Sequence, residues 1–344
     1  MAVWSQERLF SLRSKEIFMT ISVIIPYYNP DCNSETDRLL IRAVRSVIDN
    51  LAGVCDYEIV IVNDGSPSDP CVDLPPEIKY IRREHGMLGA ARNTGIDNAT
   101  GNIIAFLDAD DCYYPDSLAP CLKFMQETGT DLLGFGMKRI IVTDGEPVLK
   151  PSSERTAFSK PVTGNRYMCT HNLPGSACRY LISSALIRNN NLRFMENAFI
   201  EDEEFTPRMM HFSKKYTETV KPVYAYCIRS GSIITDVSQQ MVETKSADTV
   251  KALSSLVRFR EEHVSEPHDG LDRKISYLAM DHIRRTLRRR DWRNAINEQT
   301  GILGSMGLFP LKCKDGSLGF KLYSSFSRCR AGLLLLHLAE TFYK

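Results

Sequence analysis

Between residues 21 and 135, short apolar runs alternate with amphipathic segments of helical period, and this alternation most constrains the fold of the 344-residue chain. The runs are nearly continuous in apolar residues and rich in β-branched or aromatic side chains, which is typical of strands buried on both faces of a sheet. The segments between them place their apolar residues on one helical face. The predicted strands are residues 21–25, 58–62, 78–81, 103–107 and 132–135, and the predicted helices are residues 37–49, 88–99 and 115–127. This order predicts an α/β layer fold that binds ligands at the carboxyl ends of its strands.

The pattern changes after residue 135. Residues 136–200 are rich in Pro, Ser, Gly and Asn and give only weak strand signals. A short helix is predicted over Asp202–Phe212, and residues 223–228 (VYAYCI) alternate like a strand. From about residue 242 onward the apolar period is helical, whereas the first eighteen residues fit no element. At ~150 residues per domain, the length suggests about two domains, or one domain with a large extension.

Composition and charge narrow the class of protein. Hydrophobic residues make up 43% and charged residues 25%, which excludes a disordered or fibrous chain. Because 43 Lys and Arg balance 42 Asp and Glu, the net charge of +1 argues against a dedicated nucleic-acid binder. The 10 Cys form no CxxC pair, which is typical of reduced thiols rather than of a disulfide framework or a zinc site. No apolar run approaches the ~18 residues that span a bilayer, and residues 1–18 lack a signal-peptide core, so a cytoplasmic protein is expected.

Polar residues follow three of the predicted strands, as Pro26-Tyr27-Tyr28-Asn29, Asn63-Asp64-Gly65-Ser66 and Asp108-Ala109-Asp110-Asp111. Since the carboxyl ends of parallel strands share one edge of a sheet, we expect the carboxylates to lie close together and to need a cation. Mg²⁺ or Mn²⁺ would suit such oxygen ligands. In the alternative interpretation Asp64 only begins a turn, and Asp111 caps the helix that Pro115 opens, which is the favoured role for Asp111.

Other ligand-binding motifs are missing from the sequence. No G-x-G-x-x-G follows the first predicted strand, and no GxxxxGK[ST] occurs. Both absences argue against a Rossmann dehydrogenase and a P-loop NTPase.

Four motifs stand in order along the chain: PYYN, VNDGS, the stretch Gly89–Gly95 (GAARNTG) and FLDADD. Together they resemble glycosyltransferase family 2, the inverting nucleotide-sugar transferases of GT-A fold. The resemblance covers about residues 20–130 and extends more weakly to about residue 235, through residues 200–205 and 226–233.

The resemblance implies a GT-A mixed sheet flanked by helices, with a C-terminal helical extension. The expected domains are an N-terminal extension (1–18), a GT-A domain (19–240, with a donor half of about 20–135 and an acceptor half of about 136–240) and a helical region (241–344).

The resemblance assigns donor-side roles residue by residue. Pro26 and Tyr28 would lie against the nucleotide base, and Asp64 would accept a hydrogen bond from it. Asp108 would hold the ribose or a metal-bound water. Asp110 would be the direct ligand of the Mn²⁺ or Mg²⁺ that binds both donor phosphates.

Four further residues receive roles with an open alternative. Arg92 would pair with a phosphate or with Asp108, or form only a structural ion pair. His211 could complete the metal shell, although a surface or core histidine is favoured. Arg229 and Ser232 would close over the diphosphate, and a tight turn explains them equally well.

The acidic run that begins at Glu201 supplies the expected catalytic base. An inverting transfer needs one carboxylate that takes the proton of the acceptor hydroxyl while its oxygen attacks the anomeric carbon. By the resemblance this is Asp202, with Glu201 as an acceptor-side contact. The alternative is an acidic helix start that the helix dipole stabilises, and this solvated role is the one expected for Glu203 and Glu204.

The C-terminal region carries a basic segment, residues 281–293, and an apolar segment, residues 332–343. Together they could dock peripherally on an anionic inner membrane, and the favoured alternative is a solvated helix face beside a core helix. The basic segment is the only feature of nucleic-acid type, and it lacks interleaved aromatic residues, so no nucleic-acid partner is expected.

The sequence thus predicts a metal-dependent transferase, using a nucleotide-diphosphate sugar, expected to be UDP-linked, and a saccharide or lipid-linked saccharide acceptor. Assembly of bacterial surface polysaccharide is the expected setting. A nucleotidyltransferase and a non-catalytic sugar-nucleotide-binding or scaffold subunit are the alternatives. The donor sugar, the linkage and the oligomeric state do not follow from the sequence.

Overall fold

The computed structural model describes residues 18–142, 147–151, 156–228, 239–264, 270–312 and 316–342. By their spatial contacts, the described residues fall into two compact units. The first takes those within Met1–Val162, Ser176–Ala198 and Ser213–Thr235, and the second takes those within Thr163–Gly175, Phe199–Phe212 and Asp236–Lys344.

The first unit contains an eight-stranded mixed sheet with the order β3-β2-β1-β4-β7-β6-β8-β5. Its strands are β1 (Thr20–Tyr27), β2 (Asp56–Asp64), β3 (Lys79–Arg83), β4 (Ile103–Phe106), β5 (Cys112–Tyr113), β6 (Leu132–Ile141), β7 (Tyr180–Ser183) and β8 (Tyr216–Ile228). Its helices are α1 (Ser34–Leu51), α2 (Met87–Asn98), α3 (Leu118–Thr128) and α5 (Ser184–Asn189), with a 3₁₀ turn at Ala177–Arg179.

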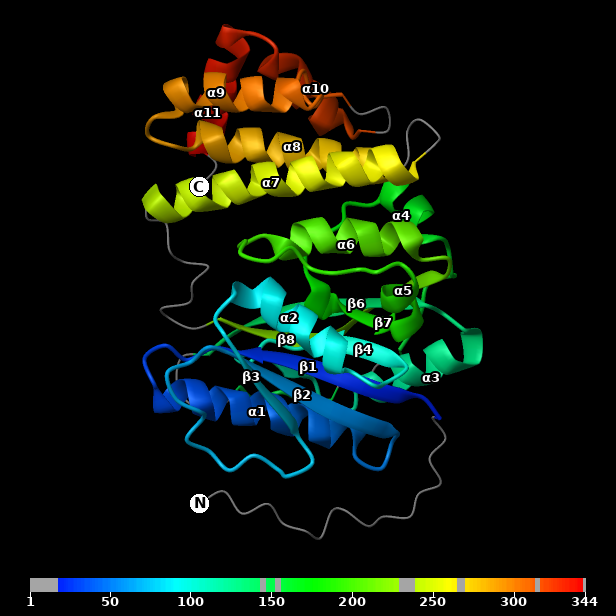
Figure 1. Cartoon of the computed structure of the whole chain (residues 1–344). Coiled ribbons are helices and arrows are strands. Elements are labelled where there is room, and N and C mark those ends of the chain that lie inside the picture. The colour runs from blue at the N-terminus through cyan, green and yellow to red at the C-terminus, as the bar shows by residue number, and fades with distance from the viewer. Residues whose placement is uncertain are drawn as a thin grey trace. The chain divides into compact units, whose positions relative to one another are not determined.

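The strand β1 lies at the centre of a parallel half-sheet, because it pairs in parallel with both β2 and β4. From β1 the chain adds β2 on one side and β4 on the other, so right-handed crossovers place α1 and α2 on opposite faces of the sheet (Figure 1). Residues 21–27 are buried as a consequence, which confirms the prediction of strands covered on both faces.

The other half of the sheet departs from the predicted pattern. The strand β7 pairs antiparallel with both β4 and β6, and β5 pairs antiparallel with β8. The weak strand signals over residues 136–200 therefore understated the regular structure, since β6 runs on to Ile141 and α4 (Gly164–Thr170), β7 and α5 follow. Only the first four residues of β6 are fully buried, and β7 has four residues, so neither gives the long apolar run that marks a central strand.

The second unit is helical. It contains α4 (Gly164–Thr170), α6 (Glu201–Phe212), α7 (Gln239–His263), α8 (Gly270–Leu287), α9 (Trp292–Ser305), α10 (Leu318–Ser327) and α11 (Arg330–Phe342). The predicted helix at Asp202–Phe212 is confirmed, and it begins one residue earlier. Leu253 and Leu256 of α7 and Ile275 of α8 are buried, as the helical period after residue 242 predicts.

Two buried cations at the start of α8 organise the loop that follows α4. The Arg273 guanidinium donates to the carbonyl of His171 at 2.7 Å, and the Lys274 ammonium donates to the carbonyl of Leu173 at 2.7 Å. These bonds satisfy backbone carbonyls of a segment that forms no helix or strand, and so they fix its path. The helical unit thus includes two segments, around α4 and α6, that come earlier in the chain than α7.

Candidate functional site

The carboxyl ends of β2, β1 and β4 lie side by side, because these strands are parallel neighbours. Tyr27 pairs with Asn63, and Ile24 pairs with Phe106, so the residues that follow these strands meet at one edge of the sheet. The chain turns in opposite directions from β1, and an open α/β sheet binds its ligand at such a point. The predicted donor-side residues Tyr28, Asp64 and Asp108 are therefore brought to one edge.

At the end of β1, Pro26 is buried and Tyr28 is exposed. The Tyr28 ring stacks on the ring of His85, with centroids 4.5 Å apart. The His85 Nδ1 lies 2.9 Å from Asp64 Oδ2, so these three side chains form one group. A flat aromatic surface beside a carboxylate can receive a heterocyclic base that carries an N–H donor.

The Asp64 carboxylate is buried at the end of β2 and has several donors around it. The backbone N–H of Gly86 donates to Asp64 Oδ1 at 3.1 Å, and the Arg83 guanidinium pairs with the same oxygen. Buried carboxylates require such partners. Arg83 was not among the predicted site residues, because a single Arg at the end of a short strand carries no motif.

A second buried carboxylate, Asp37, shapes the loop after β1. Asp37 Oδ1 accepts from Asn29 Nδ2 at 2.9 Å and also from the Tyr27 hydroxyl, while Oδ2 accepts from the backbone N–H of Cys71 at 2.9 Å. Burial, followed by this bond to Asp37, raises the pKa of Tyr27 well above its ordinary value. The sequence pattern gave Asp37 only as a helix residue, because nothing local shows that the end of β1 and the loops after β1 and β2 converge on it.

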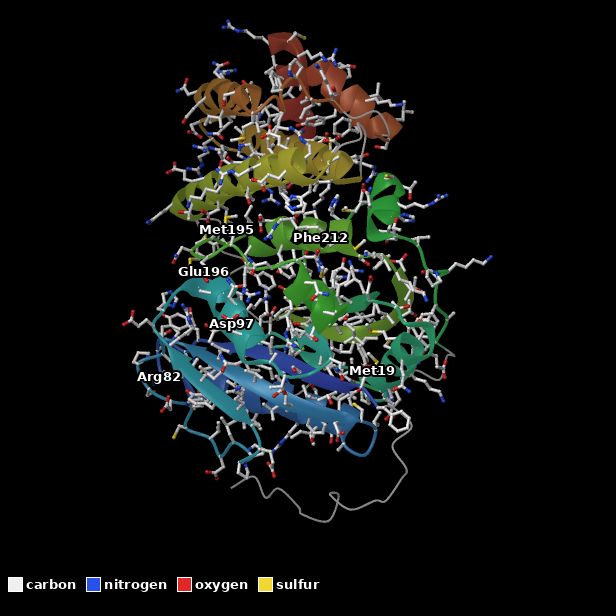
Figure 2. All side chains as sticks on the ribbon, turned by 45° about the vertical axis from the view of Figure 1, so that its right-hand side comes forward. Met19, Arg82, Asp97, Met195, Glu196 and Phe212 are labelled. Carbon is white, nitrogen blue, oxygen red and sulfur yellow. The ribbon has the colours of Figure 1, made fainter. Side chains whose placement is uncertain are left out.

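The stretch Gly89–Gly95 is explained by close packing of α2. A Cβ on Gly89 would lie 2.1 Å from the carbonyl oxygen of Met195, and a Cβ on Gly95 would lie 2.3 Å from a methyl of Ile24. Asn93 exchanges hydrogen bonds of 3.0 and 2.8 Å with the backbone of Phe194. The stretch therefore docks the segment that contains Met195 and Glu196, both labelled in Figure 2, onto the sheet.

Arg92 is the largest fully buried side chain of the described residues. Its guanidinium lies 3.0 Å from Asp108 Oδ1 and over the rings of Phe106 and Phe194, at 5.8 and 5.3 Å from their centroids. The ion pair with Asp108 was one of the roles expected for Arg92. Its contact with a phosphate stays a prediction.

The loop that carries Asp110 and Asp111 is held from two sides. On one side the Arg42 guanidinium of α1 donates to the backbone carbonyl of Asp110. On the other side, the Tyr224 hydroxyl donates to Asp111 Oδ2 at 2.6 Å and the backbone N–H of Cys227 donates to Oδ1 at 2.7 Å. The predicted cap is wrong, since α3 begins at Leu118 and Asp111 is instead bonded to β8.

Burial, then the carboxylates of Asp110 and Asp108, raise the pKa of Asp111 to about 9. Asp108 and Asp110 are partly exposed, whereas Asp111 is fully buried. Among the described residues, no group of three or more His, Cys, Asp or Glu is arranged to hold a metal by itself. One or two partly exposed carboxylates at this edge of the sheet nevertheless fit Mg²⁺ or Mn²⁺, which take part of their ligands from substrate phosphates.

In the second unit, the acidic run begins α6. Glu201 is buried, whereas Asp202 is partly exposed. The solvated role expected for Glu203 and Glu204 is wrong. Glu203 pairs with Lys274 of α8 at 2.6 Å, and Glu204 is 2% exposed.

The buried Glu204 carboxylate links α6 to α7. It accepts from the Ser255 hydroxyl at 2.7 Å and pairs with Arg208 one turn further along α6. The sequence could not show this, because the partner Ser255 lies fifty-one positions away. Two of the four acidic residues are thus held by helices that the motif does not include.

His211 lies in an aromatic cluster at the end of α6. Its ring meets those of Phe212 and Phe259 edge to face, with centroids 5.3 and 5.4 Å apart, and His263 stacks on Phe259 at 4.2 Å. This packing corresponds to the favoured alternative of a core histidine, and metal ligation by His211 stays a prediction. The predicted diphosphate contacts Arg229 and Ser232, with Ser230 between them, lie outside the described residues.

Four of the six Arg in the basic segment, residues 281–293, form ion pairs. Glu340 of α11 pairs with both Arg284 and Arg288, at 2.6 and 2.5 Å. Arg285 pairs with Asp281 at 2.7 Å, and Arg289 pairs with Asp291 at 2.7 Å. Most of the positive charge that the sequence placed there is therefore engaged within the unit.

None of the described helices combines the length and the apolar character needed to cross a bilayer. The described cysteines form no disulfide, in line with the reduced thiols that the sequence predicts.

Residues 22–186 match the sequence model of the family described as Glycosyl transferase family 2. An uncharacterized glycosyltransferase of Rickettsia conorii (RC0461) is 40% identical over 112 residues, which are 31% of this chain and 17% of that protein. The minor teichoic acid biosynthesis protein GgaB of Bacillus subtilis is 26% identical over 228 residues, which are 63% of this chain and 24% of that protein. The chain thus spans about a fifth of the length of these relatives.

Among solved structures, Staphylococcus aureus TarS 1-349 in complex with UDP-GlcNAc superposes with a TM-score of 0.63 at 17% identity. The superposition covers 94% of this chain and 91% of that one. It confirms the predicted fold, a GT-A mixed sheet flanked by helices with a helical extension.

Proposed function

Because residues 22–186 belong to glycosyl transferase family 2, we propose that this chain transfers a sugar from a UDP-sugar to a saccharide or lipid-linked saccharide acceptor. The observation that carries the proposal is the meeting of Tyr28, Asp64 and Asp108 at adjacent parallel strand ends. Two similar proteins support this proposal, since GgaB is a teichoic acid biosynthesis protein and TarS was crystallised with UDP-GlcNAc. We therefore place the activity in assembly of bacterial surface polysaccharide.

The strand ends supply the donor contacts. The exposed ring of Tyr28 offers a stacking face for a pyrimidine, and Asp64 offers an acceptor for the imide N–H of uracil. Asp108, oriented by Arg92, is the acceptor for a ribose hydroxyl. Uracil is favoured over cytosine, because the ring nitrogen of cytosine that faces a carboxylate carries no hydrogen.

Asp110 would hold Mg²⁺ or Mn²⁺ together with the donor phosphates. The cation, when bound, would supply positive charge to the leaving diphosphate. The loop supports this assignment because its backbone is tied to Arg42 while Asp111 is tied to Tyr224, which leaves the Asp110 carboxylate partly exposed.

Asp202 would act as the general base. It takes the proton of the acceptor hydroxyl, that oxygen bonds to the anomeric carbon, and the bond from this carbon to the diphosphate breaks with its electron pair leaving on the phosphate oxygen. A single displacement inverts the anomeric configuration. The assignment is supported by the partial exposure of Asp202 in the first turn of α6, where the helix dipole favours an ionised carboxylate. The buried Glu201 would contact the acceptor.

The test is a panel of UDP-sugars scored by thermal shift, donor hydrolysis and transfer, each with Mn²⁺ and with EDTA. We expect one or a few donors to raise the melting temperature and to be hydrolysed only with the metal. Asp110→Asn should abolish the metal-dependent thermal shift and the metal-dependent hydrolysis of the donor. The matched control is Asp116→Asn, which changes an exposed carboxylate in the same region.

Two results would count against the proposal. Donor binding without hydrolysis or transfer on any acceptor would indicate a sugar-nucleotide-binding subunit. Donor affinity in Asp110→Asn that is unchanged and independent of metal would remove Asp110 as the ligand. The anomeric configuration of the product, measured by NMR, tests inversion separately.

A further inference from the structure

The last two helices expose an unusual number of apolar side chains. Of the large apolar side chains that are exposed among the described residues, nearly half lie in α10 and α11. Leu318 is 75% exposed and Leu335 is 55% exposed. Single exposed apolar residues are ordinary on a protein surface, but a concentration of them over two neighbouring helices marks an interaction surface. The exposed set is Leu318, Leu322, Phe326, Leu334, Leu335 and Leu338, here named the leucine face.

The leucine face follows helical spacing. In α10, Leu318, Leu322 and Phe326 are four positions apart and so lie along one side, while Phe320 and Ser324 on another side are buried. In α11, Leu334, Leu335 and Leu338 share one side in the same way. Each of the two helices thus exposes apolar side chains on a side that does not face the core of the unit.

The charges beside the leucine face are positive. Lys321, Arg328 and Arg330 are exposed, and no carboxylate of the described residues lies within ion-pair distance of them. The acidic residue of these two helices, Glu340, is buried and is bound by Arg284 and Arg288 of α8. Over the described part of α10 and α11, the surface therefore combines large apolar side chains with exposed cations and shows no exposed carboxylate.

We propose that α10 and α11 dock on an anionic lipid bilayer, with the leucine face at the acyl boundary and Lys321, Arg328 and Arg330 at the headgroup phosphates. A second copy of the chain would bring the same cations against each other, which disfavours a self-complementary interface. Figure 1 draws the two helices in orange to red. The segment at residues 281–293 is not required, because α11 itself occupies Arg284 and Arg288 through Glu340.

The proposal does not depend on transferase activity, although it would bring the chain to a surface that carries lipid-linked acceptors. The test is flotation of the full chain with vesicles of phosphatidylcholine alone, and with vesicles that contain phosphatidylglycerol as well. We expect binding to the anionic vesicles, little binding to the neutral ones, and weaker binding as salt is raised.

Two sets of variants separate the contributions. Leu334→Gln/Leu335→Gln/Leu338→Gln should lower the partition coefficient on the order of 100-fold, because three side chains lose their apolar contact. Lys321→Gln/Arg328→Gln/Arg330→Gln should lower it about fivefold for each cation removed, and only with anionic vesicles. Ile141→Gln/Val220→Gln, which changes exposed apolar residues of β6 and β8, is the matched control and should bind like wild type.

The melting temperature of every variant shows whether it is folded like the wild type. Absence of flotation with anionic vesicles, or equal flotation of the triple leucine variant, would overturn the proposal. A concentration-dependent dimer that the leucine variant abolishes would also overturn it and would reassign the face to a protein interface. Because flotation needs no donor sugar, these outcomes are independent of the test of the proposed function.

Discussion

At the scale of single residues, the least expected finding is how Asp111 is held. The sequence favoured Asp111 as a helix cap, but the Tyr224 hydroxyl and the Cys227 backbone N–H donate to it from β8. Tyr224 also accepts from the backbone N–H of Asp108 at 3.3 Å, so one buried hydroxyl touches both ends of the motif. The loop geometry thus depends on a residue that no motif contains.

Tyr224→Phe tests this dependence. The change removes the donor to a buried carboxyl group, so we expect the free energy of unfolding to fall by about 1–3 kcal/mol. Metal-dependent UDP binding should weaken as well, because the loop with Asp110 loses one of its supports. Urea unfolding and calorimetry with Mn²⁺ measure the two effects. Tyr226→Phe, on the same strand, is the control, and equal effects in both variants would contradict a special role for Tyr224.

Asp202→Asn tests the proposed base. The variant keeps the shape of the side chain but cannot take a proton, so transfer should fall by roughly 10²–10⁴-fold. Donor and metal affinity should stay close to wild type, since other residues hold those ligands. Steady-state kinetics with the donor found by the panel would decide. Glu203→Gln is the matched control, and if Asp202→Asn kept most activity, the base would have to be another residue.

At the scale of elements, α6 shows how a motif can depend on distant helices. Its acidic start was predicted as a solvated helix end, yet Glu203 and Glu204 are held by α8 and α7. A buried carboxylate needs hydrogen-bond donors around it, and here Arg208 and Ser255 provide them. The position of α6 against α7 and α8 therefore depends on Glu203 and Glu204 as well as on its apolar side chains.

Glu204→Gln should destabilise the protein, because it removes the buried negative charge that pairs with the guanidinium of Arg208. Breaking one member of a buried ion pair costs about 3–5 kcal/mol. Chemical denaturation of wild type and variant measures the change. Glu261→Gln, an exposed carboxylate of α7, should change the unfolding free energy little. Equal unfolding free energies of Glu204→Gln and wild type would show that the pair of Glu204 with Arg208 does not stabilise the fold.

At the scale of the whole molecule, buried histidine links stability to pH. Burial lowers the pKa of His282, whose Nε2 lies 2.8 Å from Gln299 Oε1. A histidine with a lowered folded pKa binds fewer protons in the folded than in the unfolded state. His282 therefore does not lower the stability of the folded state at a pH well above its ordinary pKa of 6.5. As the pH falls below that value, the unfolded state gains a proton more readily, and the free energy of unfolding decreases.

His282→Gln should remove this pH dependence. We expect the melting temperature of wild type to fall more steeply than that of the variant between about pH 7.5 and pH 5.5. Differential scanning fluorimetry across this range, taken as the difference between the two proteins, isolates His282 from groups that titrate in both. A constant difference at every pH would contradict the assignment. His171→Gln, an exposed histidine, provides the matched control.

The sequence by itself determined the parallel half of the sheet, the order of its motifs and the edge at which they meet. It could do so because the periodicity of apolar residues that are close together in the chain predicts buried strands and amphipathic helices. The tertiary structure alone decided the antiparallel strands, the role of Asp111, and the partners of Glu203 and Glu204. These depend on contacts such as Tyr224 with Asp111 and Ser255 with Glu204, which join positions far apart in sequence. Burial and donor supply at such positions are set only when the chain has folded, and no local pattern encodes them.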